Sequence, residues 1–441
     1  MLGGDDQALT IATMRIDLLI TKHVTVHNVG EIEFMIVAKE ASSSALKGIK
    51  TVVDDEGNCR LYAVGYDQRL SVWTIDTLAM TQKKSTSLKF ISSAPIDIFD
   101  VNCLDVCKIK FKNNDCREII AIGGEGVELI SMNPNFFRAA KALHLSNYLL
   151  LTCGAGFSAD SGLATYEQMA ETYQTFCNPL KLIEDEDRFQ SFWREFALTY
   201  LTTKPHEGYH VIERFCLKKE IELKQSNHIS PWYIYSSNVD GLFQQFDCFK
   251  NSLCEIHGCA TNMCCSNGMG YDNGLERKGK IWKDWNDRVS KSLVEDDCST
   301  SVTIKSKDSF QKNCKNCLLP LRPNVLMFND TDQNVLQNIE AQRERYQNWE
   351  EVVEEEVERN DCKLVILELG AGLNVPAVRE ESEEVLTDCC RRTSGNVTLI
   401  RVNPQDAGSS NNEVLTNLIP IFEKAEHALL VIEQWLDIIK N

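Results

Sequence analysis

Three polar side chains able to do chemistry follow apolar runs that are typical of β-strands. Asn238 and Asp240 come at the end of the β-rich run that begins at Tyr233, and His257 lies just after Glu255 and just before a glycine. Imidazole is the side chain whose ordinary pKa allows it to take or give a proton near neutral pH. Because polar residues at the carboxyl ends of strands border the ligand crevice of an open α/β sheet, we expect these side chains to face a ligand.

Two further strand-like runs end in glycine turns. The apolar run 149–151 leads into Gly154-Ala155-Gly156, with Ser158 close behind, and the run 365–369 breaks at Gly370. A strand that stops at Gly-x-Gly and hands over to a helix points backbone N–H groups at one spot, which suits a phosphate. The pattern predicts dinucleotide binding, with the two turns flanking one nucleotide.

Taken in this order, the segments resemble the sirtuins, the family of NAD-dependent protein deacylases, over about residues 136–441. Residues 154–162 match the pattern Gly-Ala-Gly-x-Ser-x-x-Ser-Gly, residues 238–240 are similar to Asn-Ile-Asp, and residues 257–258 match His-Gly. Weaker matches lie at residues 204–210, at residues 321–328, which are similar to Leu-Arg-Pro-x-Val-Val-x-Phe, and at residues 401–403.

The chain departs from the family pattern after the first turn. Residues 164–167 are Ala-Thr-Tyr-Glu where the family has Pro-Asp-Phe-Arg, so the acid Glu167 replaces a basic residue near the cofactor. The family's Thr-Gln before Asn238 is Ser236-Ser237, and its Gly-Thr-Ser is residues 370–372, Gly-Ala-Gly. These departures indicate a divergent branch.

The resemblance implies a role for each matching residue. His257 is the expected general base, Asn238 holds the ribose or the attacking water, and Asp240 with Val239 binds the nicotinamide amide. The remaining expected cofactor-binding residues are Gly154, Ala155, Gly156 and Ser158 at the phosphates, Tyr166 beside the nicotinamide, and Gly370 and Asn403 at the adenosine.

The implied function is an NAD-dependent protein lysine deacetylase or deacylase. It would transfer the acyl group of an acyl-lysine protein to ADP-ribose and release nicotinamide. Two alternatives stay open at this point. An NAD glycohydrolase on the same fold needs only the Asn and the His to direct water at the ribose, and the loss of the basic residue at Glu167 fits it. The second alternative is a non-catalytic WD-repeat scaffold for a tRNA-modifying enzyme.

The cysteines predict a second site. The chain has 18 cysteines and no apolar signal segment at residues 1–15, which favours a reducing compartment, cytoplasmic or nuclear. Cys314 and Cys317 form a Cys-x-x-Cys pair where sirtuins carry half of a structural zinc site. The first pair is incomplete, because Cys264 and Cys265 are adjacent and adjacent cysteines rarely bind one metal together. Zinc therefore needs one of them plus a remote partner, and Cys259 and Cys298 are close in sequence.

Composition limits the remaining functions. With 441 residues, 43% hydrophobic and 25% charged, the chain is expected to be globular with two or three domains. It has no run of about 18 apolar residues, so we expect no membrane span. The net charge of −18 argues against strong nucleic-acid binding and would attract a basic substrate tail. Residues 350–358, with Val352, Val353 and Val357, and residues 380–384 are expected to be solvated acidic helix faces.

Residues 1–133 differ in pattern from the rest. Short β-rich runs with Gly and Asp between them predict partial propeller blades, and residues 67–73 resemble a WD repeat. The segment also resembles the closing repeats of WD-repeat proteins that partner a tRNA ribose methyltransferase. A propeller needs at least four blades and this segment supplies two complete units. We therefore expect the end of a longer propeller, a truncated or fused product, or a piece that pairs with a protein partner.

The domain boundary is expected at residues 133–135, before a helical pattern at residues 136–143. From there strands alternate with helices at residues 189–200, 208–217 and 426–440. This alternation predicts an α/β fold with a doubly wound, parallel, Rossmann-like sheet over residues 134–441. Residues 259–320, rich in Gly, Asn, Lys and Cys, are expected to be a small inserted zinc-ribbon-like module.

Overall fold

The computed structural model describes residues 2–3, 9–14, 32–38, 46–53, 59–65, 67–75, 88–96, 101–110, 116–133, 135–223, 229–272, 275–276, 278–292, 301–359, 362–392 and 396–440. The chain forms two compact units, one of Met1–Pro134 with Trp435–Asn441 and one of Asn135–Gln434. Among the described residues, no helix is both long and apolar enough to cross a membrane.

The first unit is built from antiparallel sheets. Strands β4 (Leu46–Val53), β5 (Cys59–Gly65), β6 (Arg69–Ile75) and β7 (Leu88–Pro95) form a four-stranded meander. Two three-stranded sheets comprise β1 (Leu2–Gly3), β2 (Leu9–Met14) and β3 (Ile32–Ala38), and β8 (Cys103–Lys110), β9 (Cys116–Gly124) and β10 (Gly126–Met132). Propeller blades are also four-stranded sheets, and the WD-repeat assignment stays a prediction.

A buried ion pair joins two sheets of this unit. Arg60 of β5 donates to Glu118 of β9 through Nε at 3.2 Å and Nη2 at 2.5 Å, and both side chains are at most 2% exposed. The Tyr62 hydroxyl donates to the same carboxylate. Because a buried charge is costly without a partner, losing either Arg60 or Glu118 would destabilise the packing of β5 against β9.

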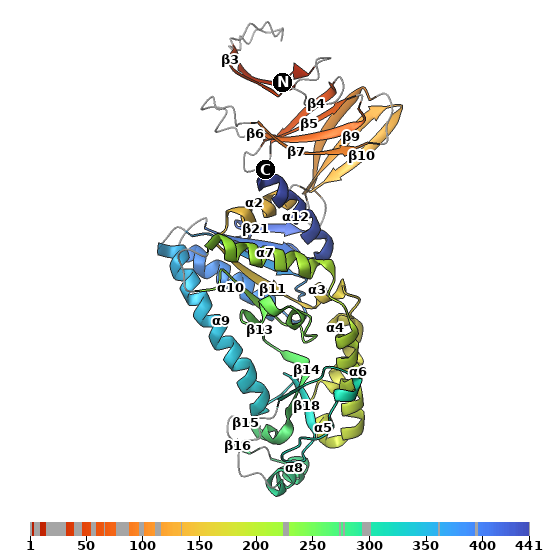
Figure 1. Ribbon diagram of the computed structural model, residues 1–441, viewed down its shortest axis with the longest axis vertical. Helices are drawn as coiled ribbons and strands as arrows, with labels where there is room; N and C mark the ends of the chain where they lie inside the picture. The colour runs from red at the N-terminus through yellow and green to blue at the C-terminus, as the bar shows by residue number, and fades with distance from the viewer. Residues whose placement is uncertain are drawn as a thin grey trace. The chain divides into compact units, whose positions relative to one another are not determined.

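Six parallel strands form the main sheet of the second unit (Figure 1). They are β11 (Tyr148–Cys153), β12 (Trp232–Ser236), β13 (Leu253–Glu255), β19 (Leu364–Leu369), β20 (Val397–Val402) and β21 (Leu418–Ile421). Their spatial order is β13-β12-β11-β19-β20-β21, and every neighbouring pair is parallel. This is the strand order of the doubly wound dinucleotide-binding sheet, so the predicted fold class is confirmed. The order reverses between β11 and β19, where such sheets have their ligand crevice.

Both faces of the sheet are buried, which explains why its strands are continuous apolar runs. Tyr148 and Leu150 of β11 belong to a core cluster with α9 (Gln333–Arg359) and α10 (Ala377–Arg392). Leu149 and Leu151 point to the opposite face and are 0% exposed. Helices α2 (Asn135–Leu145) and α7 (Glu207–Leu223) also belong to this unit, as do the single turn α11 (Asn412–Leu415) and α12 (Ala425–Lys440) up to Gln434.

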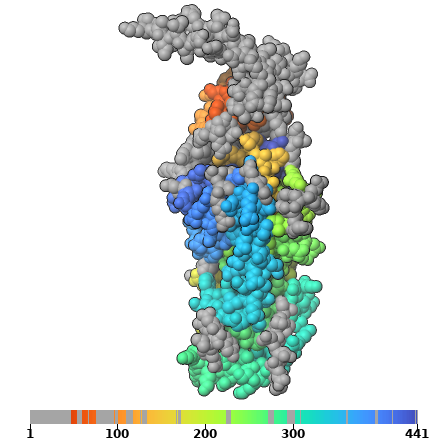
Figure 2. Space-filling model, turned by 90° about the vertical axis from the view of Figure 1, so that its left-hand side faces the viewer, coloured from red at the N-terminus to blue at the C-terminus, as the bar shows by residue number. Residues whose placement is uncertain are grey.

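Helix α9 runs along the face of the unit that Figure 2 shows. Val353 and Val357 are buried against the sheet, whereas Val352 is 40% exposed among the glutamates. The expectation of a solvated face therefore applies to the acidic side of this helix and not to Val353 and Val357.

A smaller lobe extends beyond the strand ends. It contains the sheet β17-β14-β18, with β14 (Gly258–Cys265), β17 (Ser301–Thr303) and β18 (Leu321–Val325), the pair β15 (Tyr271–Asp272) and β16 (Leu275–Glu276), and α8 (Lys280–Lys291). Helices α4 (Tyr166–Phe176), α5 (Leu180–Glu184) and α6 (Glu186–Thr202) join it. Trp193 of α6 shares one core cluster with Trp282 and Trp285 of α8. The lobe thus includes residues 166–202 as well as the expected insert.

The turns that follow β11 and β19 interlock through glycine. The short helix α3 (Ala155–Ala159) starts directly after Gly154. Gly156 N–H donates to Gly370 O at 3.0 Å, and a Cβ on Gly156 would lie 2.8 Å from that oxygen. Gly370 has φ of +61°, and a Cβ there would lie 2.2 Å from the nitrogen of Phe157. Side chains are therefore excluded where the strand order reverses.

Replacing Gly370 by alanine should lower the free energy of unfolding by about 2 to 4 kcal/mol, because the methyl group meets the Phe157 nitrogen and the left-handed φ is strained. Gly372→Ala is the matched control. It has nothing within 4 Å of its added Cβ and should change stability by less than about 0.5 kcal/mol. Urea unfolding of the full chain, followed by tryptophan fluorescence, measures both. Equal stability of the two variants would contradict the interlock.

Candidate active site

Two cavities meet at the carboxyl ends of β11, β12 and β19. The larger has a volume of about 800 Å³ and the smaller about 290 Å³. They share the wall residues Ala155, Leu163, Ala164 and Val375. The crevice expected at the reversal of strand order is therefore present, and it has a wide and a narrow part.

The Ser158 hydroxyl is the centre of a buried hydrogen-bond network beside the smaller cavity. It donates to Asp240 Oδ2 at 2.6 Å and accepts from Asn238 Nδ2 at 2.9 Å. Since its single hydrogen goes to Asp240, the Tyr209 hydroxyl at 3.3 Å must donate to it. Helix α3 and the loop after β12 are fixed to each other through this one oxygen.

Asn238 presents an acceptor to the cavity. Its Nδ2 donates to Gly154 O at 3.0 Å and to Ser158, which fixes the orientation of the amide. Its Oδ1 is buried and has no hydrogen-bond partner among the described residues, and the residue lines the smaller cavity. A buried acceptor without a partner is costly, so this position is ready for a donor from a ligand.

His257 lines the same cavity with one ring nitrogen available. Its Nδ1 lies 3.2 Å from Ser237 O, and a carbonyl oxygen only accepts, so Nδ1 carries the proton. Nε2 then has a free lone pair. Burial lowers the pKa of His257, and the hydrogen bond to the Ser237 carbonyl offsets only part of this lowering. The ring is thus neutral at physiological pH and can take a proton.

Two buried carboxyl groups lie behind these residues. Burial raises the pKa of Asp240, despite the bonds that it accepts from Ser158 and from Leu242 N–H at 2.8 Å. Burial also raises the pKa of Glu255 to about 8, and Gln244 Nε2 donates to it at 2.5 Å. The polar end of the cavity is therefore a weakly solvated region in which charge is disfavoured.

An apolar wall completes the smaller cavity. Tyr173 and Cys177 come from the end of α4, Tyr200 from α6, and Met327 and Phe328 from the loop after β18. The loop is anchored because Phe328 N–H donates to Cys177 O at 3.0 Å.

Asp330 holds the same loop from its other side. Its Oδ2 accepts from Met327 N–H at 3.1 Å, and its Oδ1 accepts from the buried Arg322 of β18 at 2.9 Å. The position of Met327 on the cavity wall is therefore fixed by an ion pair inside the smaller lobe.

The larger cavity is bordered by the loop after β20. Asn403 Nδ2 donates to Ala371 O at 2.9 Å, and its Oδ1 accepts from the N–H groups of Gln405 and Asp406, each at 2.9 Å. This side chain therefore fixes both its own loop and the turn after β19. Asp406 and Lys424 bring opposite charges to the wall.

The structure brings most of the predicted residues to these cavities. Ala155, Gly156, Gly370 and Asn403 line the larger one, and Ala155, Ser158, Asn238, Val239, Asp240 and His257 line the smaller. Gly154 is buried behind the wall, and its carbonyl accepts from Asn238. Tyr166 is the first residue of α4, and its side chain lies outside the described part of the chain.

Sequence reasoning missed the residues that shape the site from a distance. Tyr209 lies within the weak match at residues 204–210, and Tyr173 and Tyr200 belong to no motif. Each of the three is an aromatic in an amphipathic helix, a pattern shared with ordinary core residues. A polar partner such as Ser158 becomes visible only in three dimensions.

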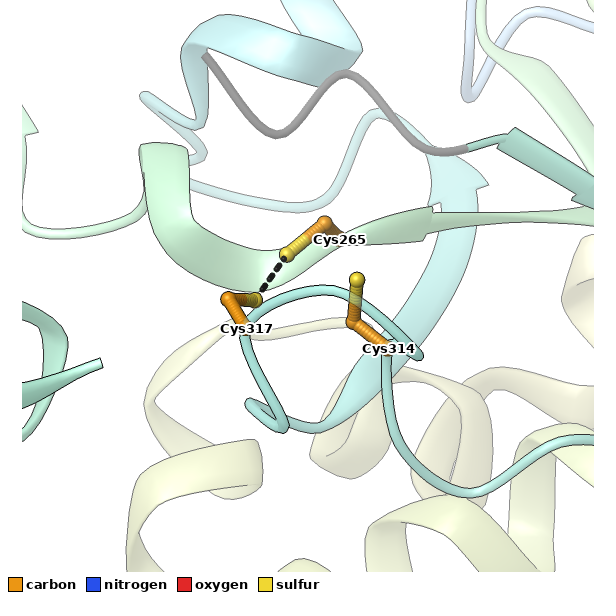
Figure 3. Close-up of side chains that lie close together, drawn as sticks. All are labelled: Cys265, Cys314 and Cys317. Atoms are coloured by element: carbon orange, nitrogen blue, oxygen red, sulfur yellow. Dashed lines mark hydrogen bonds between the residues drawn. The ribbon is translucent and has the colours of Figure 1, made fainter. Parts of the chain in front are cut away.

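Three buried thiols lie together in the smaller lobe. Figure 3 shows the sulfur atoms of Cys265, Cys314 and Cys317 pointing toward one another, and all three lie within 4.8 Å of each other. The Sγ atoms of Cys265 and Cys317 are 3.2 Å apart. Thiolates around one zinc ion, each about 2.3 Å from the metal, need this kind of proximity. The donor set fits a zinc ion with three protein ligands among the described residues.

Cys264 is a correction to the predicted ligand set. Successive side chains of a strand point to opposite faces, so Cys264 faces away from Cys265 and packs against Val335 and Ile339 of α9. Cys259 lies outside the cluster and contacts the Thr261 hydroxyl at 3.1 Å. Cys298 lies outside the described residues.

The raised pKa of Glu255 has a consequence for stability. The folded chain keeps a proton up to about pH 8 that the unfolded chain releases near its ordinary pKa of 4.5. The stabilisation is complete below the unfolded value and is lost as pH rises through about 8. We expect the melting temperature to fall between about pH 4.5 and about pH 8 and the fall to be smaller in Glu255→Gln. Differential scanning calorimetry measures it, with the exposed Glu351→Gln as control. An identical pH profile for Glu255→Gln and the parent would refute the assignment.

No family model matches the sequence. Over 148 residues the chain is 26% identical to NAD-dependent protein deacylase 2 of Pseudomonas aeruginosa, a match that covers 31% of this chain and 54% of that protein. The chain thus spans about half the length of the curated relative it matches.

Two solved Sir2 structures are also similar to this chain. A Sir2 homologue in complex with NAD has 15% identity and a TM-score of 0.42, and the match covers 69% of this chain and 93% of that one. A Sir2 complex with the inhibitor EX-527, 2'-O-acetyl-ADP-ribose and a deacetylated p53 peptide has 17% identity and a TM-score of 0.38, covering 67% and 97%. The sequence similarity to an NAD-dependent protein deacylase confirms the resemblance to the sirtuin family that the ordered motifs indicate.

Proposed function

We propose that this protein is an NAD-dependent protein deacylase whose chemistry takes place in the smaller cavity. One observation carries the proposal. The unpartnered Oδ1 of Asn238 and the free Nε2 of His257 line one cavity whose opposite wall is apolar. An acceptor for a hydroxyl or amide donor, a base of lowered pKa and an apolar slot are what acyl transfer from lysine to a sugar requires.

NAD fits the two cavities together. The larger has room for the adenosine half, with Asn403 and Gly370 on its wall, and the smaller has room for the nicotinamide end. The glycine interlock lets a ligand approach the backbone closely at the turn after β11. The N–H groups of Gly154 and Gly156 are already bonded to Leu369 O and Gly370 O, so Gly156 contributes space more than hydrogen bonds.

When bound, NAD would supply a ribose carbon that could lose nicotinamide and bond to the carbonyl oxygen of the acyl-lysine. Asn238 Oδ1 accepts from a ribose hydroxyl and holds the sugar in place. His257 Nε2 takes a hydroxyl proton, and the Ser237 carbonyl stabilises the resulting positive ring through Nδ1–H. Ser158 keeps Asp240 and Asn238 at fixed positions during the transfer.

An NAD glycohydrolase is the second candidate. The acidic Glu167, at the position where the resemblance expects a basic residue, favours it. The same Asn238 and His257 would then direct water at the ribose, with no need for an acyl-lysine peptide. The two candidates differ in whether nicotinamide release depends on peptide.

His257→Ala and Asn238→Ala should each lower nicotinamide release from NAD and acyl-peptide by about 10² to 10⁴-fold, because a positioned base contributes about that much. His210→Ala is the control, since that histidine is 47% exposed on α7. In the parent, kcat/KM should fall on the acid side at a pH below 6.5, because the pKa of His257 is lowered and a protonated ring cannot act as base. Unchanged turnover in His257→Ala rejects the proposal, and release without peptide selects the glycohydrolase.

We also propose that Cys265, Cys314 and Cys317 hold a structural zinc ion that stabilises the smaller lobe. The protein as isolated from a zinc-containing medium should contain about one equivalent of zinc by mass spectrometry of the digested sample. Cys317→Ser should lose the zinc and Cys264→Ala should retain it, because Cys317 belongs to the thiol cluster and Cys264 does not. Equal zinc content in the two variants rejects the site.

A further inference from the structure

We propose that Tyr209 of α7 is a positioning residue that acts through the Ser158 hydroxyl to keep the Asp240 carboxylate ionised beside the smaller cavity. The role rests on the proposed function, because Asp240 lines the cavity in which the reaction takes place. Tyr209 is not among the residues that line this cavity, so its effect must pass through other side chains.

The ring of Tyr209 is fixed by packing. The residue is 0% exposed, and its ring centroid lies 4.4 Å from that of Phe157 and 4.9 Å from those of His206 and Phe243. The ring of Phe246 stacks on it with an interplanar angle of 10°. Because a tyrosine hydroxyl lies on the axis of its ring, this packing also fixes the position of the Tyr209 oxygen.

The Ser158 hydroxyl has one hydrogen and two lone pairs, and all three are in use. The hydrogen goes to Asp240 Oδ2 at 2.6 Å, and one lone pair accepts from Asn238 Nδ2 at 2.9 Å. The second lone pair is left for the Tyr209 hydroxyl at 3.3 Å, so Tyr209 donates. The bonds therefore run in one direction, from Tyr209 through Ser158 to Asp240, and we call this chain the hydroxyl relay.

The hydroxyl relay favours a negative charge at its end. Each donation polarises the next donor, so Tyr209 strengthens the bond that Ser158 gives to Asp240. Burial raises the pKa of Asp240, and the Leu242 N–H donates to its other oxygen at 2.8 Å. No lysine or arginine is among the described residues that line the cavity. Hydrogen bonds therefore stabilise this carboxylate where a cation could have done so.

The groups that surround Asp240 are neutral below pH 7. Burial raises the pKa of Glu255 to about 8, so this carboxyl keeps its proton. Burial also raises the pKa values of the neighbouring hydroxyl and thiol groups, which are those of Tyr200, Tyr209, Cys153 and Cys259. His257 also lines the cavity, and burial lowers its pKa from 6.5. Below pH 7 the charge on this side of the cavity therefore depends on Asp240 and His257.

An ionised Asp240 suits the proposed ligand. The nicotinamide ring of NAD carries a positive charge, whereas ADP-ribose lacks this ring. A carboxylate in a weakly solvated cavity attracts a positive ring more strongly than it would in water. Tyr209 should therefore raise the affinity for NAD without contacting it, and it should have little effect on the affinity for ADP-ribose.

The test measures NAD binding to the full chain by isothermal titration calorimetry between about pH 4.5 and about pH 7. All proteins compared carry His257→Ala, which removes the second titrating group. Protonation of Asp240 removes the attraction, so NAD affinity should fall as pH falls through the pKa of Asp240. Tyr209→Phe should move the midpoint of this fall to higher pH by about half a unit or more and lower NAD affinity at the parent midpoint by about 3- to 10-fold.

Three further substitutions test whether the effect passes through the hydroxyl relay. In a Ser158→Ala background, Tyr209→Phe should have no further effect, because the relay is already broken. Tyr209→3-fluorotyrosine keeps the ring and makes its hydroxyl a stronger donor, so the midpoint should move to lower pH. Tyr148→Phe removes a buried hydroxyl from the core cluster with α9 and α10 and should leave the midpoint unchanged.

Binding data keep the test valid for a poorly folding variant. Each affinity is fitted separately from the number of binding sites, so the midpoint does not depend on how much of a variant is folded. ADP-ribose is the matched ligand, and its affinity should not show the fall that NAD shows.

The outcomes separate the role of Tyr209 from the proposed function. An NAD affinity that does not change with pH, an unchanged midpoint in Tyr209→Phe, or an equal shift in the Ser158→Ala background overturns the relay while NAD binding stands. The expected shifts, found with a parent protein that releases no nicotinamide in the presence of acyl-peptide, support the relay and overturn the deacylase reaction. Failure of NAD to bind at every pH overturns both.

Discussion

The backbone contact between the two glycine turns governs the geometry of the site. Gly156 and Gly370 approach so closely that no Cβ fits at either position, and the hydrogen bond between them joins the ends of β11 and β19. The contact lies at the reversal of strand order, from which the crevice opens. Packing between the two turns is sufficient to require glycine at both positions. A ligand can occupy the open space next to the turns.

The hydrogen bonds of the site depend on one hydroxyl, that of Ser158. Helix α3 follows Gly154 directly, so the position of Ser158 depends on the interlock. Ser158 in turn fixes Asp240 and Asn238 after β12, and the short link to β13 and β14 places His257. The reacting groups Asn238 and His257 thus come from two neighbouring chain segments. Ser158 anchors the first, and the Ser237 carbonyl bonds the ring of the second.

Much of this was predictable from the sequence. Strand runs ending in glycine or polar residues predicted the parallel sheet, because buried strands are continuous and apolar, and they brought Asn238 and His257 to one edge. The contribution of α4 and α6 to the smaller lobe was not predictable, since the aromatic residues of an amphipathic helix do not show which core they join. The opposite orientation of the Cys264 and Cys265 side chains was not predictable either, because it follows only once both residues are known to lie within a strand.

Strand β18 lies between a thiol pair and two residues of the cavity wall. Cys314 and Cys317 precede Leu321, and Met327 and Phe328 follow Val325, so the five residues of the strand, about 17 Å of extended chain, lie between the two sites. The strand is hydrogen-bonded along β14. The thiol cluster and this part of the cavity wall therefore belong to one continuous segment, and the same β-ladder holds both in place.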